Sequence, residues 1–307
     1  MTEQAMFRGA GTALVTPFRV DGALDEAALA RLVDWQIDQG INFLVPCGTT
    51  GENPALSTDE VRRVIETTVR QANGRVPVLA GAGSNSTDKA VELALTAIDL
   101  GADGLLTITP YYNKPNPDGL LRHFSTQGAA AAKRKPDFPM ILYNVPGRTG
   151  VNMTAETTLR IAREVPNVAG VKEASGNMEQ ILEILRSRRD GFLVLSGDDA
   201  WALPLIGAGA DGLISVASNE VPKLVSELVA NALLGDFDAA RSIHNRLLPL
   251  LTGNFIESNP IPVKTAMKML GILESDTVRS PLAPISDANR KRLELILREC
   301  GLNDAHH

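Results

Sequence analysis

The sequence is poor in cysteine and histidine, and this shortage removes several classes of function. The two cysteines, Cys47 and Cys300, lie far apart and form neither a CxxC motif nor a disulfide framework, so we expect reduced thiols in a cytoplasmic protein. The 4 histidines have no spacing typical of metal ligands, and no metal centre is predicted. Two of them, His306 and His307, end the chain and are interpreted as a tail.

A basic surface and long apolar runs are also missing. The formal net charge is −6 and the charges are scattered, whereas nucleic acid or an anionic membrane would bind a basic stripe. No apolar run reaches the roughly 20 residues of a membrane-spanning helix, and the first residues show no pattern of a signal peptide. Hydrophobic residues make up 44% and charged residues 21%, the ordinary composition of a globular protein.

What the sequence does contain is a regular alternation of short β-rich runs and longer amphipathic segments. Eight such units between residues 11 and 234 match the number and length expected of a (β/α)8 TIM barrel. The predicted strands are 11–18, 42–48, 76–83, 104–110, 139–146, 168–175, 192–199 and 212–219. The predicted helices are 26–40, 57–73, 86–100, 118–133, 154–164, 178–188, 201–206 and 221–234.

Local signals support these boundaries. Asp25 is a predicted N-cap, Gly40 a C-cap, and the segment STDE from Ser57 a capping box. A weak internal repeat, LGADGLLTITP at 100–110 and AGADGLISVAS at 208–218, has the same order of helix end, turn and strand. A doubly wound open sheet is the alternative, but the first strand is not followed by the GxGxxG loop that such sheets carry.

The chain is expected to form two regions, a catalytic barrel at 7–234 and a helical appendage at 235–302. Three further helices are predicted in the appendage, at 237–251, 263–270 and 287–300, separated by the segments NPIP and SPLAP. We expect this appendage to pack on the barrel and not to form an independent domain.

Lys172 is the most unusual residue of the predicted strands. It lies in the apolar run VAGVKEAS, where burial of an unpaired ammonium is costly. One interpretation is a lysine whose amine extends to solvent or pairs with a carboxylate such as Glu173. The other is a desolvated, nucleophilic amine that attacks a carbonyl to form a Schiff base.

The active site of such a barrel forms at the carboxyl ends of its strands. The side chains predicted there supply an amine, phenols, hydroxyls and one guanidinium, from Lys172, the three tyrosines, Thr49, Thr50, Ser196, Ser215 and Arg148. Each alone has an ordinary alternative, such as a tyrosine of the barrel wall, a surface arginine, or a simple turn at Gly48 and Gly51 beside the threonines. Together they suit a 2-keto acid that forms an imine at Lys172, with Tyr143 moving protons and no cofactor.

The strings CGTTGE, TPYYN, YNVPGRTG, GVKEASG, SGDD and NPIPVK occur in this order along the chain. In these the chain resembles the dihydrodipicolinate synthase family, within the pyruvate-dependent class I aldolases that include N-acetylneuraminate lyase. The resemblance covers residues 7–302. It implies that pyruvate condenses with L-aspartate-4-semialdehyde to 4-hydroxy-tetrahydrodipicolinate, a step of lysine and diaminopimelate biosynthesis.

The resemblance also implies roles for individual residues. Lys172 would form the Schiff base with pyruvate, and Tyr143 would be the proton donor and acceptor. Thr49 and Tyr112 would complete a hydroxyl relay, with Tyr112 reaching in from the neighbouring subunit. The implied assembly is a homotetramer made of two tight dimers.

Four more residues would bind the substrates. Thr50 and Ile214 would contact pyruvate, and Gly197 would line the pocket of the second substrate. Arg148 would bind the carboxylate of the semialdehyde. The lyases of the same superfamily lack an arginine at this position, so Arg148 favours the synthase over a related aldolase that acts on a sugar acid. A non-catalytic barrel that binds 2-keto acids is the third alternative, and Lys172 with Tyr143 argues against it.

The chain differs from lysine-inhibited relatives at three positions. Such relatives tend to have a glutamate in place of Lys89 and histidines in place of Thr58 and Val61. Because a cationic Lys89 would repel the amines of lysine, we expect weak or no feedback inhibition, and a micromolar inhibition constant would contradict this expectation.

Overall fold

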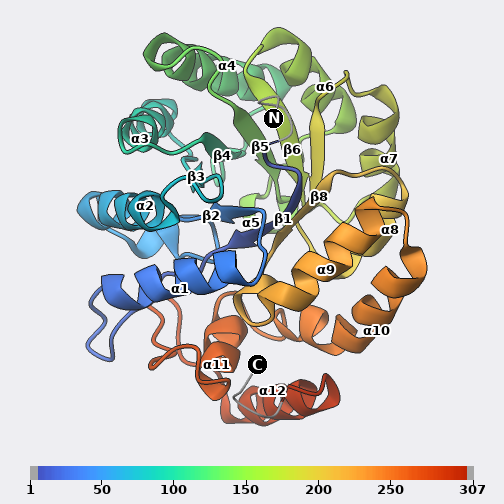
Figure 1. Cartoon of the computed structure of the whole chain (residues 1–307). Helices are drawn as coiled ribbons and strands as arrows, with labels where there is room; N and C mark the ends of the chain where they lie inside the picture. Colours follow the sequence, from blue (N-terminus) through green and yellow to red (C-terminus); the bar gives the residue numbers. More distant parts are fainter. Residues whose placement is uncertain (1–5, 303–307) are drawn as a thin grey trace.

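The computed structural model describes residues 6–302, and the predicted tail at His306 and His307 lies outside them. Eight parallel strands are ordered β2-β1-β8-β7-β6-β5-β4-β3, and a parallel bridge between Leu44 and Val78 joins the two end strands. The predicted (β/α)8 barrel is therefore confirmed (Figure 1). The strands are β1 Gly9–Ala13, β2 Phe43–Val45, β3 Leu79–Gly81, β4 Gly104–Ile108, β5 Met140–Asn144, β6 Val168–Glu173, β7 Leu193–Ser196 and β8 Gly212–Ser215.

Helices cover the outside of the barrel, as Figure 1 shows. The α-helices between and after the strands are α1 Glu26–Asp38, α2 Thr58–Ala72, α3 Thr87–Asp99, α4 Pro117–Arg134, α5 Pro146–Thr149, α6 Ala155–Glu164, α7 Met178–Ser187, α8 Ala202–Gly207 and α9 Pro222–Leu233. Single 3-10 turns occur at η2 Asn53–Ala55, η3 Asp199–Trp201 and η4 Ala217–Asn219. Asp25 caps α1 by accepting a hydrogen bond from the N–H of Ala28, and both hydrogen bonds of the Ser57–Glu60 capping box are present.

The two segments of the internal repeat have the same local structure. Gly101 and Gly209 end their helices with φ of 87° and 105°, a conformation that favours glycine. Two residues later, Asp103 and Asp211 each accept a backbone N–H of the preceding strand region at 2.9 Å. Each aspartate thus ties the start of its own strand, β4 or β8, to the strand before it.

Two local predictions were wrong in detail. The predicted strands are too long: the first, expected at 11–18, is β1 at Gly9–Ala13, and the second, expected at 42–48, is β2 at Phe43–Val45. Residues 14–18 stay buried after the ladder ends, so apolar character continues beyond the hydrogen-bonded strand. Between the strand predicted at 139–146 and the helix predicted at 154–164 lies an additional short helix, α5, because Pro146 starts a helical turn and Gly150 ends it with φ of 71°.

The inside of the barrel is filled by its own apolar cluster. Phe7 and Phe43 lie together with their ring centroids 5.5 Å apart and pack edge to face. Since Phe7 precedes β1, this pair closes the amino end of the barrel. Tyr143 and Ile214 belong to the same cluster. The polar side chains that follow the strands lie at the opposite, carboxyl end.

The three helices predicted after the barrel are present. They are α10 Phe237–Gly253, α11 Ile261–Met269 and α12 Asp287–Glu299, and Figure 1 shows α11 and α12 beside each other. Helix α10 packs on α8 and α9, and residues from all three helices belong to the same apolar core as the barrel. The division at residue 234 stays a prediction. Within residues 6–302 no helix is long and apolar enough to cross a membrane.

Candidate active site

Lys172 and Tyr143 form the centre of the site. They are register partners on β6 and β5, and Nζ of Lys172 lies 4.3 Å from the centroid of the Tyr143 ring. Their exposed fractions are 5% and 6%, so the lysine does not extend its amine to solvent. Within residues 6–302 no carboxylate forms an ion pair with Lys172. The amine is therefore buried against an aromatic face.

Glu173 is not the partner of Lys172, so that interpretation of the sequence was wrong. Consecutive strand residues point to opposite faces, and Glu173 lies on the outer face of β6 with 1% exposure. Its carboxylate accepts hydrogen bonds from Nδ2 of Asn144 at 2.9 Å, Nε2 of Gln180 at 2.9 Å and the N–H of Ser175 at 3.1 Å. Burial raises the pKa of Glu173, while these hydrogen bonds oppose the shift.

The contact between Asn144 and Glu173 joins β5 to β6 directly behind Lys172 and Tyr143. These two residues are register partners one position beyond Tyr143 and Lys172. Asn144 Oδ1 also accepts the N–H of Met153 at 2.9 Å, which fixes the segment that follows α5. The buried network therefore holds the register in which the phenol ring faces the amine. Sequence reasoning missed it, since the two side chains are 29 residues apart.

Gly197 makes room for the lysine side chain. A Cβ at this position would lie 3.0 Å from Cε of Lys172 and 2.7 Å from Cβ of Ala174. The Gly197 N–H donates to the carbonyl of Glu173 at 2.8 Å, which keeps the end of β7 against β6. A glycine is required here by the close approach of the lysine stem.

Ile214 lines the barrel interior on β8 with 1% exposure. The next residue, Ser215, donates its hydroxyl to the buried carboxylate of Asp199. Burial raises the pKa of Asp199 to about 6, although the N–H of Val216, at 2.9 Å, and other donors stabilise the anion. This contact fixes the turn after β8.

The predicted hydroxyl pair follows β2. Thr50 is 2% exposed, and its Oγ1 accepts a hydrogen bond from Nδ2 of Asn259 at 2.9 Å. Thr49 is partly exposed, and its carbonyl accepts the N–H of Glu52 at 3.1 Å. The nearby Cys47 is buried, which raises the pKa of its thiol to about 12. Cys47 is thus no nucleophile at neutral pH.

Tyr112, in the segment after β4, and Arg148, on α5, lie at the same end of the barrel but outside its interior. Tyr112 is 88% exposed with φ of 71°, and its N–H donates to the carbonyl of Thr149 at 3.3 Å. Arg148 is exposed on α5 and forms no ion pair within residues 6–302. The structure therefore brings Lys172, Tyr143, Gly197 and Ile214 together, while Tyr112 and Arg148 face outward.

No metal site accompanies this arrangement in the part of the chain that the structure describes. Residues 6–302 contain no group of three or more histidine, cysteine or acidic side chains placed to hold a metal ion. The chemistry available to the described residues is that of a buried amine, a phenol and hydroxyl groups.

Known proteins resemble this chain over nearly its whole length. Residues 6–300 match the Dihydrodipicolinate synthetase family. A relative from Koribacter versatilis named 4-hydroxy-tetrahydrodipicolinate synthase is 50% identical over 96% of both chains, and one of the same name from Oleidesulfovibrio alaskensis is 52% identical over 96% of this chain and 99% of its own.

A solved structure also matches this chain over nearly its whole length. The chloride-inhibited dihydrodipicolinate synthase of Acinetobacter baumannii, complexed with pyruvate, superposes with a TM-score of 0.92 at 42% identity, covering 96% of this chain and 99% of that one. The likeness extends over barrel and C-terminal helices alike. This chain belongs to the dihydrodipicolinate synthetase family.

Proposed function

We propose that this enzyme condenses pyruvate with L-aspartate-4-semialdehyde to 4-hydroxy-tetrahydrodipicolinate through a Schiff base at Lys172. The observation that carries the proposal is the amine of Lys172, buried at the carboxyl end of the barrel, 4.3 Å from the ring of Tyr143. Relatives about 50% identical over 96% of this chain are named for this reaction. A buried lysine without a carboxylate partner is suited to nucleophilic attack on a carbonyl.

The reaction begins when the neutral amine of Lys172 attacks C2 of pyruvate. Water leaves and a protonated imine forms, which draws electrons from the C3–H bond. Loss of a C3 proton gives an enamine, whose carbon attacks the aldehyde of the second substrate. The amino group of that substrate then attacks the imine carbon, closes the ring and releases Lys172. The Tyr143 phenol is the proposed proton donor and acceptor in these steps.

The remaining predicted residues have proposed roles around this centre. Thr49 and Tyr112 relay protons to and from Tyr143, with Tyr112 contributed by a neighbouring subunit. The 88% exposure of Tyr112 supports this assignment, because an aromatic side chain held outward is available to a partner. Its backbone is held by Thr149 in the adjoining turn.

Substrate contacts are proposed for four residues. Thr50 and Ile214 contact pyruvate, and Gly197 lines the pocket of the semialdehyde. Arg148 binds the carboxylate of the semialdehyde, since a guanidinium makes paired hydrogen bonds to a planar carboxylate. Arg148 is exposed and forms no ion pair within residues 6–302, so its guanidinium is available for this contact.

We further propose that the enzyme needs no cofactor, because the Lys172 imine itself is the electron sink and pyruvate is the covalently bound substrate. The proposed assembly is a homotetramer of two tight dimers in the cytoplasm. Buried, unpaired Cys47 and Cys300 support a reducing compartment. The exposed position of Lys89 on α3 leaves the prediction of weak lysine inhibition in place.

A competition assay tests the substrate assignment. The enzyme is given pyruvate together with aspartate semialdehyde or with sugar-derived aldehydes, and pyruvate consumption and product are followed. The proposal expects rapid turnover of the semialdehyde only. Turnover of a sugar aldehyde without the semialdehyde would keep the aldolase chemistry and overturn the synthase assignment. Binding of pyruvate without any condensation would indicate a non-catalytic barrel.

A further inference from the structure

The C-terminal helical region contacts the turn that follows β2 at two nearby residues, Thr50 and Glu52. Asn259 donates from Nδ2 to Oγ1 of Thr50 at 2.9 Å, across 209 residues of sequence. Lys264 donates from Nζ to Oε1 of Glu52 at 2.7 Å, across 212 residues. Residues that follow the barrel therefore hold this turn at Thr50 and at Glu52.

The pair of Glu52 and Lys264 is fully buried. Their side chains are 1% and 0% exposed, and Lys264 also donates to the carbonyl of Thr277 at 2.7 Å. The Lys264 amine lies 4.2 Å from the centroid of the Phe18 ring. Burial lowers the pKa of Lys264 to about 8, and the Glu52 carboxylate opposes this shift. A buried pair with these additional contacts fixes the position of Glu52 closely.

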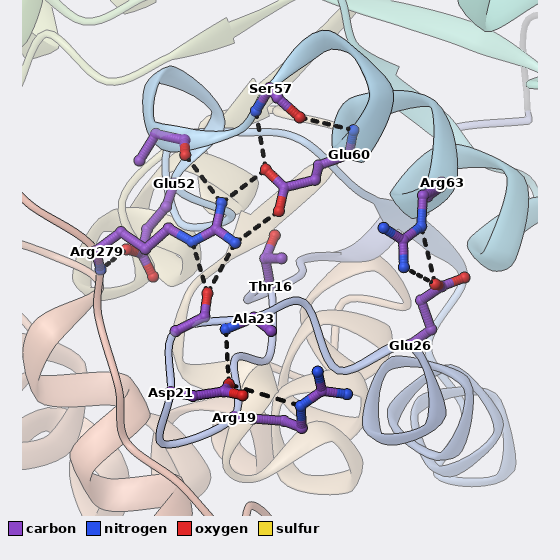
Figure 2. Close-up of polar contacts among 12 residues, drawn as sticks. Thr16, Arg19, Asp21, Ala23, Glu26, Glu52, Ser57, Glu60, Arg63 and Arg279 are labelled. Atoms are coloured by element: carbon purple, nitrogen blue, oxygen red, sulfur yellow. Dashed lines mark hydrogen bonds and ion pairs between the residues drawn. The ribbon is translucent and has the colours of Figure 1, made fainter.

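Arg279 holds the other oxygen of the same carboxylate. Its backbone N–H donates to Oε2 of Glu52 at 2.9 Å. Figure 2 shows its guanidinium reaching the Glu60 carboxylate, with contacts of 2.6 and 2.7 Å, and it also donates to the carbonyl of Gly22 at 2.8 Å. The turn from Thr49 to Glu52 is thus anchored to the C-terminal region and to the start of α2.

The direction of the hydrogen bond at Thr50 is decided by Asn259. With Nδ2 donating, Oγ1 of Thr50 is an acceptor in this contact, and its own hydrogen is free for another partner. Asn259 is 5% exposed, and its Oδ1 has no hydrogen-bond partner within residues 6–302. The reverse orientation would instead leave the amide N–H group of Asn259 without a partner. A buried N–H without a partner is less well tolerated in folded proteins than a buried carbonyl oxygen without one.

We propose that Asn259 is a positioning residue that directs the Thr50 hydroxyl hydrogen toward the carboxylate of the keto acid, with the Glu52–Lys264 pair holding the turn in place. This inference rests on the proposed function, in which Thr50 contacts pyruvate. Asn259 itself touches no substrate. It acts by occupying a lone pair of Oγ1, so that the hydrogen of Thr50 is not consumed within the protein.

The discriminating substitution is Asn259→Asp, which keeps the size of the side chain but only accepts hydrogen bonds at neutral pH. The Thr50 hydroxyl must then donate to the introduced carboxylate and loses its hydrogen for pyruvate. A charge-assisted hydrogen bond corresponds to about a 10- to 100-fold change in binding. The control is Asn245→Asp, the same chemical change at an exposed position of α10.

The experiment measures the pyruvate concentration that half-saturates borohydride trapping, together with kcat and both KM values. We expect the half-saturating pyruvate concentration and the KM for pyruvate to rise about 10- to 100-fold in Asn259→Asp, with the KM for the aldehyde within about twofold of the parent. Asn245→Asp is expected to behave as the parent. In a Thr50→Val background, Asn259→Asp is expected to add no further change, since the two residues act through one contact.

Each outcome bears on one claim. An unchanged half-saturation in Asn259→Asp, or an equal loss in the Thr50→Val background, overturns the positioning role while trapping in the parent preserves the proposed function. Absence of any trapped adduct in the parent overturns the proposed function and this inference with it. Should Asn259→Asp not fold, Asn259→Ser, which removes the amide donor with a smaller side chain, is tested in the same way.

Discussion

The amine of Lys172 lies over the face of the Tyr143 ring, 4.3 Å from its centroid, and both residues occupy the same register on neighbouring strands. In the proposed mechanism the ring face stabilises the positive charge of the protonated imine, whereas the phenol oxygen is attached at the ring edge. Tyr143 therefore has two separable proposed roles, one from its ring and one from its hydroxyl.

The first prediction separates these functions with Tyr143→Phe, which keeps the ring and removes the hydroxyl. We expect kcat to fall about 10²- to 10⁴-fold, because a general acid–base group is lost, while stability changes little. Steady-state kinetics and thermal unfolding provide the measurements. Tyr143→Leu removes ring and hydroxyl and is expected to lose stability as well. A Tyr143→Phe enzyme with the kcat of the parent would contradict the proton-transfer role.

The second prediction concerns the space beside the lysine. Gly197→Ala places a methyl group 3.0 Å from Cε of Lys172 and 2.7 Å from Cβ of Ala174, so the lysine stem must move. We expect slower Schiff-base formation and a stability loss of about 1–3 kcal/mol. The matched control is Gly207→Ala in α8, where the new methyl would make an ordinary contact of 3.5 Å with Phe237. Equal rates of borohydride trapping in Gly197→Ala and Gly207→Ala would show that the added methyl group at position 197 does not affect Lys172.

The third prediction addresses the buried ion pair. Lys264→Met alone leaves the Glu52 carboxylate buried, with the Arg279 N–H as its one remaining donor among residues 6–302. We expect a loss of about 3–5 kcal/mol in the free energy of unfolding. Adding Glu52→Gln is expected to recover part of this loss. Denaturant unfolding of the single and double variants measures the coupling.

The control for the buried pair is the exposed pair of Arg134 and Asp99, whose side chains are 56% and 44% exposed. Asp99→Asn is expected to cost at most about 1 kcal/mol, because water screens an exposed pair. If Lys264→Met were as mild as this control, the buried pair would not hold the turn.

The fourth prediction is a pH dependence at Glu60. Its hydrogen bonds from Arg279 lower the pKa of this carboxyl from 4.5 to about 2. Because the folded pKa is the lower one, the stabilisation is complete above pH 4.5 and is lost as the pH falls toward 2. The free energy of unfolding of Glu60→Gln should lie on the order of 1–3 kcal/mol below the parent at about pH 6, and the gap should narrow by about pH 3. A gap independent of pH would contradict this assignment.

Much of the barrel could be predicted from the sequence because its signals are local. Apolar runs, the N-cap at Asp25 and the capping box at Ser57 lie within a few residues of one another. Lys172 could be singled out for the same reason, as a charged residue inside an apolar strand. Strand ends were less predictable, since residues 14–18 remain buried after β1 has ended.

The supporting contacts of the site could not be predicted in this way. Asn259 meets Thr50 and Lys264 meets Glu52 only because the chain returns to the barrel after more than 200 residues. The string NPIPVK contains both Asn259 and Lys264, but sequence alone suggested only family likeness for it. Glu173 was similarly considered as a partner of Lys172, although strand alternation places it on the opposite face.

The most direct test of the central claim is borohydride reduction of the enzyme in the presence of pyruvate, followed by peptide mapping by mass spectrometry. We predict a single reduced pyruvate adduct on Lys172, absent without pyruvate and absent in Lys172→Ala. An unmodified Lys172, or an adduct on another lysine that persists in Lys172→Ala, would contradict the Schiff-base mechanism.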